Sequence, residues 1–178
     1  TAGAASARLI LQFNNTGTVD VQSGTLSLDG GGTQSGTFTI AGGAVAQFGG
    51  GNHVLTAASL VTGAGVLSLS GAATLNASGN FDAGSTLNVI AGTATLAPSC
   101  NVTAATVNIS GTGGTVIYNS SGTVGTVNVN AGTLGGTSPV TVTGLLTLAG
   151  GTVTNRLVTA DGGLTINGNT TLSGGKLV

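Results

Sequence analysis

Residues 125–134 read GTVNVNAGTL, and this stretch contains the unit from which most of the chain is built. Val127 and Val129 are apolar and flank the polar Asn128, which predicts a β-strand with one buried face. Gly132 predicts a tight corner, and Leu134 is the inward residue of a second strand. The apolar–polar–apolar pair recurs eight times: Val19/Val21, Phe38/Ile40, Leu67/Leu69, Leu87/Val89, Val107/Ile109, Val127/Val129, Leu146/Leu148 and Leu164/Ile166. Successive first members are 19, 29, 20, 20, 20, 19 and 18 residues apart, and a repeat of about 20 residues predicts a solenoid of strands.

Each repeat continues through two further strands. The inward residue of the second strand is Leu26, Val45, Leu75, Leu96, Val116, Leu134, Val153 or Leu172. A third apolar position precedes the next repeat, at Val61, Phe81, Val102, Val124, Val142, Val158 and Val178. Three short strands per coil predict an all-β, triangular parallel β-helix of about eight rungs, with residues 1–178 forming one β-solenoid domain. An antiparallel sandwich is the alternative, but hairpins require no 20-residue unit.

Two segments depart from the repeat. The first rung reads GGGTQSG (30–36) where its third strand is expected. The second rung carries about ten additional residues, which we place at 49–59. The only histidine, His53, falls in this additional segment, and we expect it to be a polar loop residue.

The chain is almost uncharged. Three residues are Lys or Arg and four are Asp or Glu, so charged residues make up 4% of the chain, against about 25% in ordinary globular domains. The basic residues are too few and too scattered for a nucleic-acid surface, and no apolar run approaches the roughly 18 residues of a membrane span. The opening TAGAASA has no basic segment followed by an apolar one, so we expect a processed mature chain or a piece of a longer protein. A surface so close to neutral favours self-association.

Residues that could carry chemistry are few and dispersed. Beside His53, the chain has a single cysteine, Cys100, so no internal disulfide can form. Its carboxylates are Asp20, Asp29, Asp82 and Asp161. We therefore expect no catalytic residue, no metal site and no cofactor. Asn-x-Ser/Thr triplets, most of which we expect by chance in a chain of this composition, begin at Asn14, Asn76, Asn101, Asn108, Asn119 and Asn169.

The outward positions of the predicted strands are polar. Asn88, Asn108 and Asn128 are 20 residues apart, so we expect a hydrogen-bonded amide ladder. A parallel column precedes it, at Thr86, Thr106 and Thr126. On the second strand, threonine occupies the outward site in seven of the eight rungs: Thr25, Thr74, Thr95, Thr115, Thr133, Thr152 and Thr171. Stacked Thr and Asn suit exposed parallel strands, and a regular Thr array is also a candidate surface for ice or for a repetitive polymer.

The units GVLSLSGAATL (65–75), GTVNVNAGTL (125–134) and GLLTLAGGTV (144–153) resemble the β-strand repeats of bacterial autotransporter passengers and filamentous-haemagglutinin-type adhesins. The resemblance covers the chain from about residue 17 onward. It implies a right-handed parallel β-helix and a secreted, surface-displayed stalk or adhesin. The chain departs from such passengers in its low charge, and it has no recognisable capping domain or translocator.

Together these features predict a non-enzymatic extracellular rod at a cell surface, in an adhesin or a self-assembling filament. The alternative is an ice-binding or polymer-binding protein that uses the outward threonines. Residues 9–13 and 176–178 are strand-like and carry no charged cap, so we expect head-to-tail self-association or continuation in a longer chain. A surface glycan or another polymer is a further expected partner, and nucleic acid is not.

Overall fold

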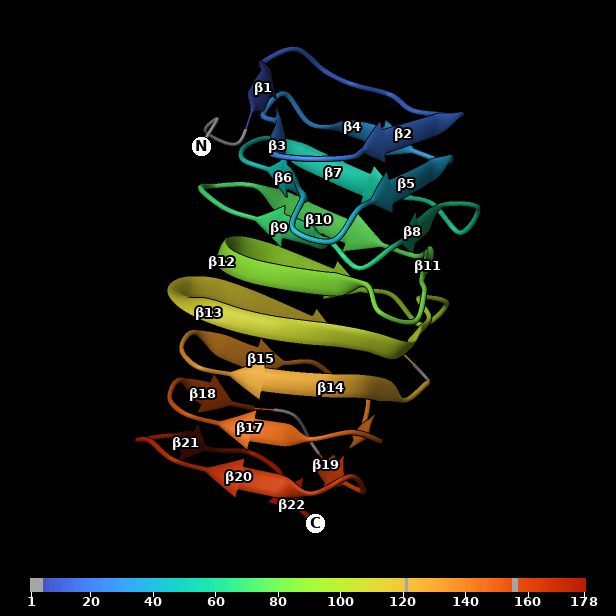
Figure 1. Ribbon diagram of the computed structural model, residues 1–178. Coiled ribbons are helices and arrows are strands. Elements are labelled where there is room, and N and C mark those ends of the chain that lie inside the picture. The colour runs from blue at the N-terminus through green and yellow to red at the C-terminus, as the bar shows by residue number, and fades with distance from the viewer. Residues whose placement is uncertain (1–4, 121, 155–156) are drawn as a thin grey trace.

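The computed structural model describes residues 5–120, 122–154 and 157–178. Within these residues the chain forms 22 strands that wind into one elongated coil, with the two termini at opposite ends (Figure 1). The strand pairings in the described part are parallel, and each joins a strand to its counterpart one coil away. The fold is therefore an all-β parallel β-solenoid, as predicted. The right-handed sense that the resemblance implies stays a prediction. None of the described residues forms a helix long and apolar enough to cross a membrane.

Each coil presents three faces. Face 1 consists of β1 (Ser6–Leu9), β3 (Thr25–Leu28), β6 (Val45–Phe48), β9 (Val66–Leu69), the first part of β12 (Thr86–Leu96), the middle of β13 (Val102–Tyr118), the second part of β14 (Val124–Val129), β17 (Leu146–Leu148) and β20 (Leu164–Ile166). Face 2 consists of β4 (Gly32–Gln34), β7 (Asn52–Leu55), β10 (Thr74–Ala77), the ends of β12 and β13, β15 (Thr133–Gly135), β18 (Thr152–Val153) and β21 (Thr171–Leu172). Face 3 consists of β2 (Thr18–Val21), β5 (Thr37–Ile40), β8 (Leu60–Thr62), β11 (Asn80–Phe81), the starts of β13 and β14, β16 (Val140–Val142), β19 (Leu157–Ala160) and β22 (Lys176–Leu177).

The length of the repeat agrees with the prediction. Successive strands of face 1 are joined by eight parallel pairings, which are eight helical steps. Each step advances the chain by about 20 residues. From the fourth coil onward, the predicted inward residues of face 1 are Cα partners in the order Leu67, Leu87, Val107, Val127, Leu146 and Leu164.

The first three coils differ from the prediction. The pairs Val19/Val21 and Phe38/Ile40 lie on face 3, where they pair with each other. Leu26 and Val45, which the repeat placed on the second strand, lie on face 1 instead. The inward pairs of face 1 in these coils are Ala7/Leu9, Leu26/Leu28 and Ala46/Phe48. Two of these inward residues are alanines, whose small side chains do not stand out as core positions in the sequence. The large apolar residues that alternate in these coils lie on face 3 instead. The prediction was therefore wrong about the face in these coils.

No insertion interrupts the coil between Phe38 and Leu67, where the structure describes every residue. The interval of 29 residues between Phe38 and Leu67 is a change of face, because Phe38 lies on face 3 and Leu67 on face 1. Segment 49–59 contains β7, a regular strand of face 2, and segment 30–36 contains β4, the face 2 strand one coil earlier. The prediction of an additional loop at 49–59 was therefore wrong, and so was the prediction that segment 30–36 lacks a strand. In the last coil Leu177, rather than the predicted Val178, pairs with Val158.

The interior of the coil is one continuous apolar core. Its largest fully buried apolar side chains include Phe38, Phe48, Leu28, Ile40, Leu55, Leu67, Leu69, Leu75, Leu87, Leu96 and Ile109. The rings of Phe38 and Phe48 pack edge to face, with centroids 6.0 Å apart. Burial of each such side chain stabilises the fold by about 1.5 to 3 kcal/mol before the loss of conformational entropy is subtracted. Stacking of coils is thus what holds the three narrow sheets together.

Glycine is required at the corners for two different reasons. Gly132 has a φ of +65°, a left-handed conformation that a side chain opposes. At Gly111, a Cβ atom would lie 1.9 Å from the carbonyl oxygen of Ile90 in the preceding coil. The corners therefore stack backbone on backbone, which keeps successive coils in register.

Candidate functional site

Face 2 carries a file of threonines on its outer side, which we call the threonine ladder. Its members are consecutive Cα partners: Thr74, Thr93, Thr115, Thr133, Thr152 and Thr171. The inward neighbours that follow them along the chain, such as Leu75 and Val116, belong to the core. Alternation of side chains along each strand therefore places every ladder threonine on the surface.

Five of the seven threonines predicted for this column lie in it. Thr25 lies instead on face 1, where it pairs with Ser6 and Val45. Thr95 lies two residues further along its strand, in register with Asn76 and Ile117. The ladder member that the sequence missed is Thr93.

The ladder is extended by Asn52, which is the Cα partner of Thr74. The Thr74 hydroxyl donates a hydrogen bond to Asn52 Oδ1 at 2.9 Å, and the Asn76 amide donates to the same oxygen at 3.2 Å. The neighbouring outward column is mixed and contains Val54, Asn76, Thr95, Ile117 and Gly135. The ladder is therefore a line of hydroxyls rather than a two-dimensional lattice.

Face 1 carries a broader polar surface, which we call the Thr/Asn patch. It consists of two in-register columns over three coils: Thr86, Thr106 and Thr126, and Asn88, Asn108 and Asn128. The Asn128 amide donates to Asn108 Oδ1 at 2.7 Å. Asn88 Oδ1 accepts from the Ser110 hydroxyl at 2.8 Å. One hydrogen bond therefore links two adjacent asparagines of the patch across coils, whereas Asn88 is bonded to Ser110 outside the patch.

His53 lies inside the coil, contrary to the prediction of a polar loop residue. It is fully buried on β7, where it is the Cα partner of Leu75. Its ring stacks on Phe48, with centroids 3.9 Å apart and planes 6° from parallel. Nε2 is 2.9 Å from the Gly50 carbonyl oxygen, and Nδ1 has no hydrogen-bond partner of normal geometry among the described residues. Burial lowers the pKa of His53, and the hydrogen bond to Gly50 opposes this only in part.

Cys100, Asp29 and Asp82 are also held in place by burial or by contacts with neighbouring side chains. Cys100 is buried, and burial raises the pKa of its thiol to about 12. The Asp29 carboxylate accepts hydrogen bonds from the Ser27 hydroxyl and, in an ion pair, from Arg8, and these two contacts lower its pKa. Asp82 accepts from the Thr62 hydroxyl at 3.2 Å. Over residues 5–120, 122–154 and 157–178, no three His, Cys, Asp or Glu side chains gather into a candidate metal site.

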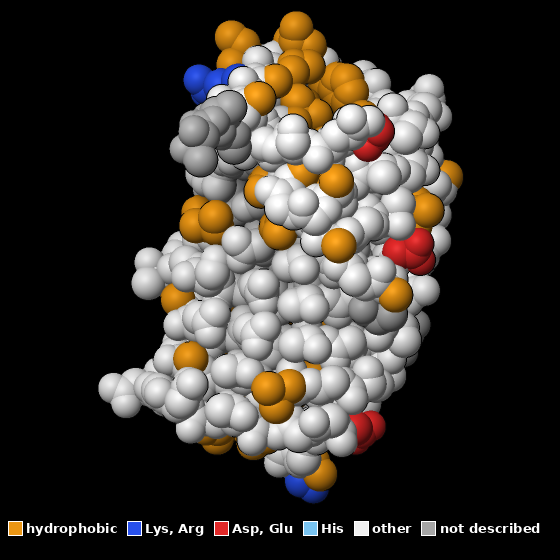
Figure 2. All heavy atoms as spheres, viewed as in Figure 1, with side chains coloured by type: hydrophobic (Ala, Val, Ile, Leu, Met, Phe, Trp, Pro, Cys, Tyr) orange, Lys and Arg blue, Asp and Glu red, His pale blue; other side chains and the backbone are white. Residues whose placement is uncertain are grey.

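The face of the molecule shown in Figure 2 is dominated by uncharged polar side chains and backbone. Charged side chains are sparse and dispersed in this view. Comparison with protein-family models, with curated proteins and with solved structures finds no match for this chain. The resemblance to autotransporter passengers and adhesins therefore rests on the repeat pattern, and what the structure adds to it is the β-solenoid.

Proposed function

We propose that this chain is a non-enzymatic structural rod that is displayed outside the cell, as a stalk or filament segment of a surface adhesin. The observation that carries the proposal is the uninterrupted stack of parallel coils. Eight helical steps at about 4.8 Å each give a rod of about 40 Å. A rod of this kind grows in length simply by the addition of coils, and so it suits a spacer that holds a binding part away from a surface.

The placement of the chemically active groups supports a role without catalysis. A nucleophile or a general base must reach its substrate from a cleft or surface. His53 and Cys100, the only residues of their types in the chain, are instead part of the apolar core. The Asp29 carboxylate is occupied by Ser27 and Arg8.

In this proposal the rod is the spacer, and the Thr/Asn patch is the surface that binds the adhesion target. Its uncharged hydroxyl and amide groups can donate hydrogen bonds to, and accept them from, the hydroxyl groups of a glycan. The patch repeats in steps of one coil, so it suits a repetitive polymer better than a single small molecule.

Two measurements test the rod. Small-angle X-ray scattering from the purified chain should give an elongated particle about 40 Å long. Antibodies raised against the chain should label intact, unpermeabilised cells that produce the full-length protein. Labelling only after permeabilisation would reject a role at the surface, even if the particle proved to be a rod.

A second candidate function is the binding of ice or of a repetitive polymer by the threonine ladder. Six threonines in register at a spacing of about 4.8 Å favour this candidate, because a regular file of hydroxyls and methyl groups can order water. The mixed neighbouring column counts against ice, which presents a two-dimensional lattice.

The ice-binding candidate is tested by thermal hysteresis. If the ladder binds ice, Thr115→Tyr should remove the hysteresis by disrupting the middle of the file. Thr39→Tyr, at an outward position of face 3, is the matched control and should leave it intact. The absence of hysteresis in the unsubstituted chain at high concentration would leave the ladder as a purely structural feature.

A further inference from the structure

The threonines of the Thr/Asn patch are bounded at both ends of their column by apolar side chains. Thr86 is the Cα partner of Val66, which is half-buried on the outer side of face 1. At the other end of the patch, Leu145 lies beside Thr126, because the residues that follow these two are Cα partners. Leu145 is 44% exposed. One outward column of face 1 therefore runs along the rod in the order Val66, Thr86, Thr106, Thr126 and Leu145.

The neighbouring outward column is polar over the same coils. Its members are Ser68, Asn88, Asn108, Asn128 and Thr147. We call these two columns together the axial strip. Four steps from coil to coil separate Val66 from Leu145, which gives the strip a length of about 19 Å. The two columns are about 7 Å apart.

The middle of the strip offers hydrogen-bonding groups to a ligand. The Oδ1 atoms of Asn88 and Asn108 each accept a hydrogen bond from a neighbouring side chain, so both asparagines can donate through their amide N–H groups. The hydroxyls of the patch threonines can both donate and accept. The strip is therefore polar in its middle and apolar at the two ends of one column.

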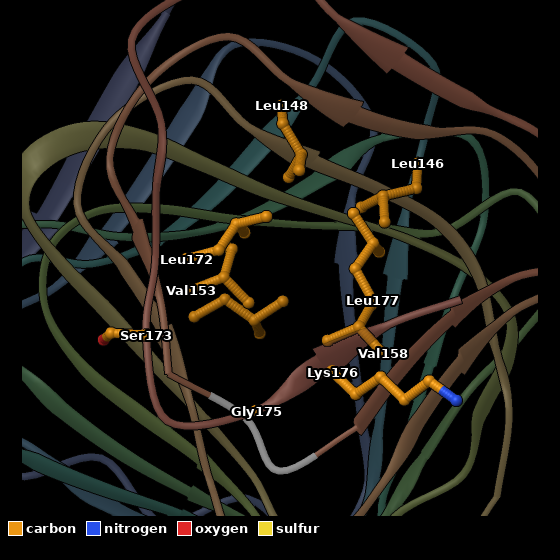
Figure 3. A pocket seen from close by; sticks show the side chains of 10 residues that line it. Leu146, Leu148, Val153, Val158, Leu172, Ser173, Gly175, Lys176 and Leu177 are labelled. Carbon is orange, nitrogen blue, oxygen red and sulfur yellow. The ribbon is translucent and has the colours of Figure 1, made fainter.

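The inner side of the strand at one end of the strip is seen in Figure 3. Leu146 and Leu148 lie around a hollow in the core, so Leu145 and Thr147 face outward by the alternation of side chains. The hollow has about 20 Å³ of free volume, room for about one water molecule, and cannot hold a sugar ring. At this end of the strip, apolar contact with a sugar therefore comes from Leu145, on the outer side.

The dimensions and charge of the strip indicate the class of its ligand. A strip of about 19 Å by 10 Å covers about 200 Å², whereas a stable protein partner needs about 800 Å². A single extended polymer chain fits this shape. None of the ten residues of the strip is charged, so a charged polymer would lose hydration here without gaining an ion pair.

We propose that the axial strip binds one segment of a neutral, linear polysaccharide that lies along the rod axis. Apolar faces of its sugar rings contact Val66 and Leu145 at the two ends. Its hydroxyls form hydrogen bonds with the threonines and asparagines between them. The inference rests on the proposed adhesive function of the Thr/Asn patch and deepens it by naming the class of ligand and the direction in which it lies.

Titration calorimetry with oligosaccharides of defined length tests the class of ligand. The probes are the disaccharides and hexasaccharides of β-1,4-linked glucose, β-1,4-linked N-acetylglucosamine and α-1,4-linked glucose, with the hexamer of galacturonic acid as the acidic control. At least one neutral hexasaccharide should bind at least about tenfold more tightly than its disaccharide, because only the longer chain spans the strip. The acidic hexamer should not bind. Binding of the acidic hexamer alone, or of none of the three neutral hexasaccharides, would overturn the proposal.

Two variants test the direction of the bound chain. Leu145→Ala removes the apolar contact at one end of the strip and should weaken binding of the hexasaccharide about tenfold. Ile90→Ala is the matched control, because Ile90 is also 44% exposed and lies beside Asn88 in the direction of the strand, outside the strip. It should leave the affinity unchanged. Equal losses in both variants, or a loss in Ile90→Ala alone, would overturn the axial direction.

The same samples separate this proposal from the proposed function. Both substituted side chains are largely exposed, so thermal melts should show that both variants stay folded. A chain that is a rod in scattering and is displayed at the cell surface, but binds no neutral hexasaccharide, would reject the ligand of the axial strip alone. A chain that is not a rod would reject the proposed function.

Discussion

His53 shows how one polar side chain is accommodated inside an apolar coil. Its ring occupies a position of the inward column that in later coils is filled by Leu75, Ala94 and Val116. Contact with Phe48 on one side and a hydrogen bond to Gly50 hold the neutral ring. A proton added to this ring would introduce a charge into the core, which carries a high desolvation cost.

We therefore expect the stability of the chain to fall on mild acidification. The pKa of His53 is lowered below its ordinary value of 6.5, so its contribution is complete above pH 6.5 and is lost as the pH falls through the folded-state pKa. The free energy of unfolding should decrease by at most about 1.4 kcal/mol for each pH unit in this window. Thermal unfolding measured between pH 7.5 and pH 5.0 tests this expectation.

His53→Phe is the control for this acid effect. It keeps an aromatic ring against Phe48 and removes the titrating group. Its melting temperature should be nearly constant over the same pH range. An equal pH dependence in both proteins would show that another group is responsible.

Cys100 should be unreactive in the folded chain. Its thiol is buried, and a pKa of about 12 keeps it protonated at pH 8. A thiol reagent such as Ellman's reagent should react with Cys100 only after denaturation. Ser99→Cys in a Cys100→Ala background places a thiol at the exposed neighbouring position and should react at once without denaturant. Fast labelling of the native Cys100 would contradict its assignment to the core.

At the scale of single strands, the alternation along β12 can be tested with one charge at adjacent positions. Leu87 is fully buried, so Leu87→Asp leaves an unpaired charge in the core and should cost about 3 to 5 kcal/mol. Asn88 faces outward and accepts a hydrogen bond from Ser110, which a carboxylate also accepts, so Asn88→Asp should change stability by about 0.5 kcal/mol or less. Thermal melts of the two variants decide the register, and similar losses at both sites would contradict it.

The strands could be predicted from the sequence where large apolar residues alternate, as in β12, β14 and β17. The prediction failed where the inward residue is alanine. Ala46 and Ala94 are fully buried, yet neither is a residue that stands out as core. Because Ala46 is small, the face 1 strand of its coil was not recognised. In β12, Leu96 was taken as the inward residue that matches Leu75, whereas the structure matches Ala94 with Leu75. The prediction therefore placed Thr95 in the ladder instead of Thr93.

Which of two nearby residues of a strand belongs to a given column is decided by its pairing with the strands of the neighbouring coils. Those strands lie about 20 residues away in the sequence. The sequence of one strand cannot supply that information, because either face of a short alternating strand satisfies the local pattern. For the same reason, the position of His53 in the core could not be predicted from its polar, glycine-rich surroundings.

For the whole molecule, stability should depend on the position of a coil along the rod. In a stack, each coil contacts only its neighbours, so a defect in the middle weakens two interfaces and a defect at the end weakens one. Leu87 is fully buried, whereas Leu164, in the same column of face 1, is 42% exposed. In dilute solution Leu87→Ala should therefore cost about 2 to 5 kcal/mol, and Leu164→Ala well below that range.

Hydrogen exchange distinguishes the two defects. The end variant should raise exchange only in the last coil or two, and the central variant should raise it through the neighbouring coils on both sides. Uniform exchange along the whole chain in both variants would mean that the rod unfolds as one unit.

The hydrogen bonds between coils run along the axis of the rod, and this direction has a mechanical consequence. A force that pulls the two ends apart acts parallel to these hydrogen bonds. It therefore breaks the hydrogen bonds of one coil before those of the next, instead of loading the bonds of many coils at once. Each coil that opens releases about 20 residues, or about 70 Å of extended chain. A tether built in this way lengthens under tension in nearly equal steps and dissipates work while its covalent backbone stays intact.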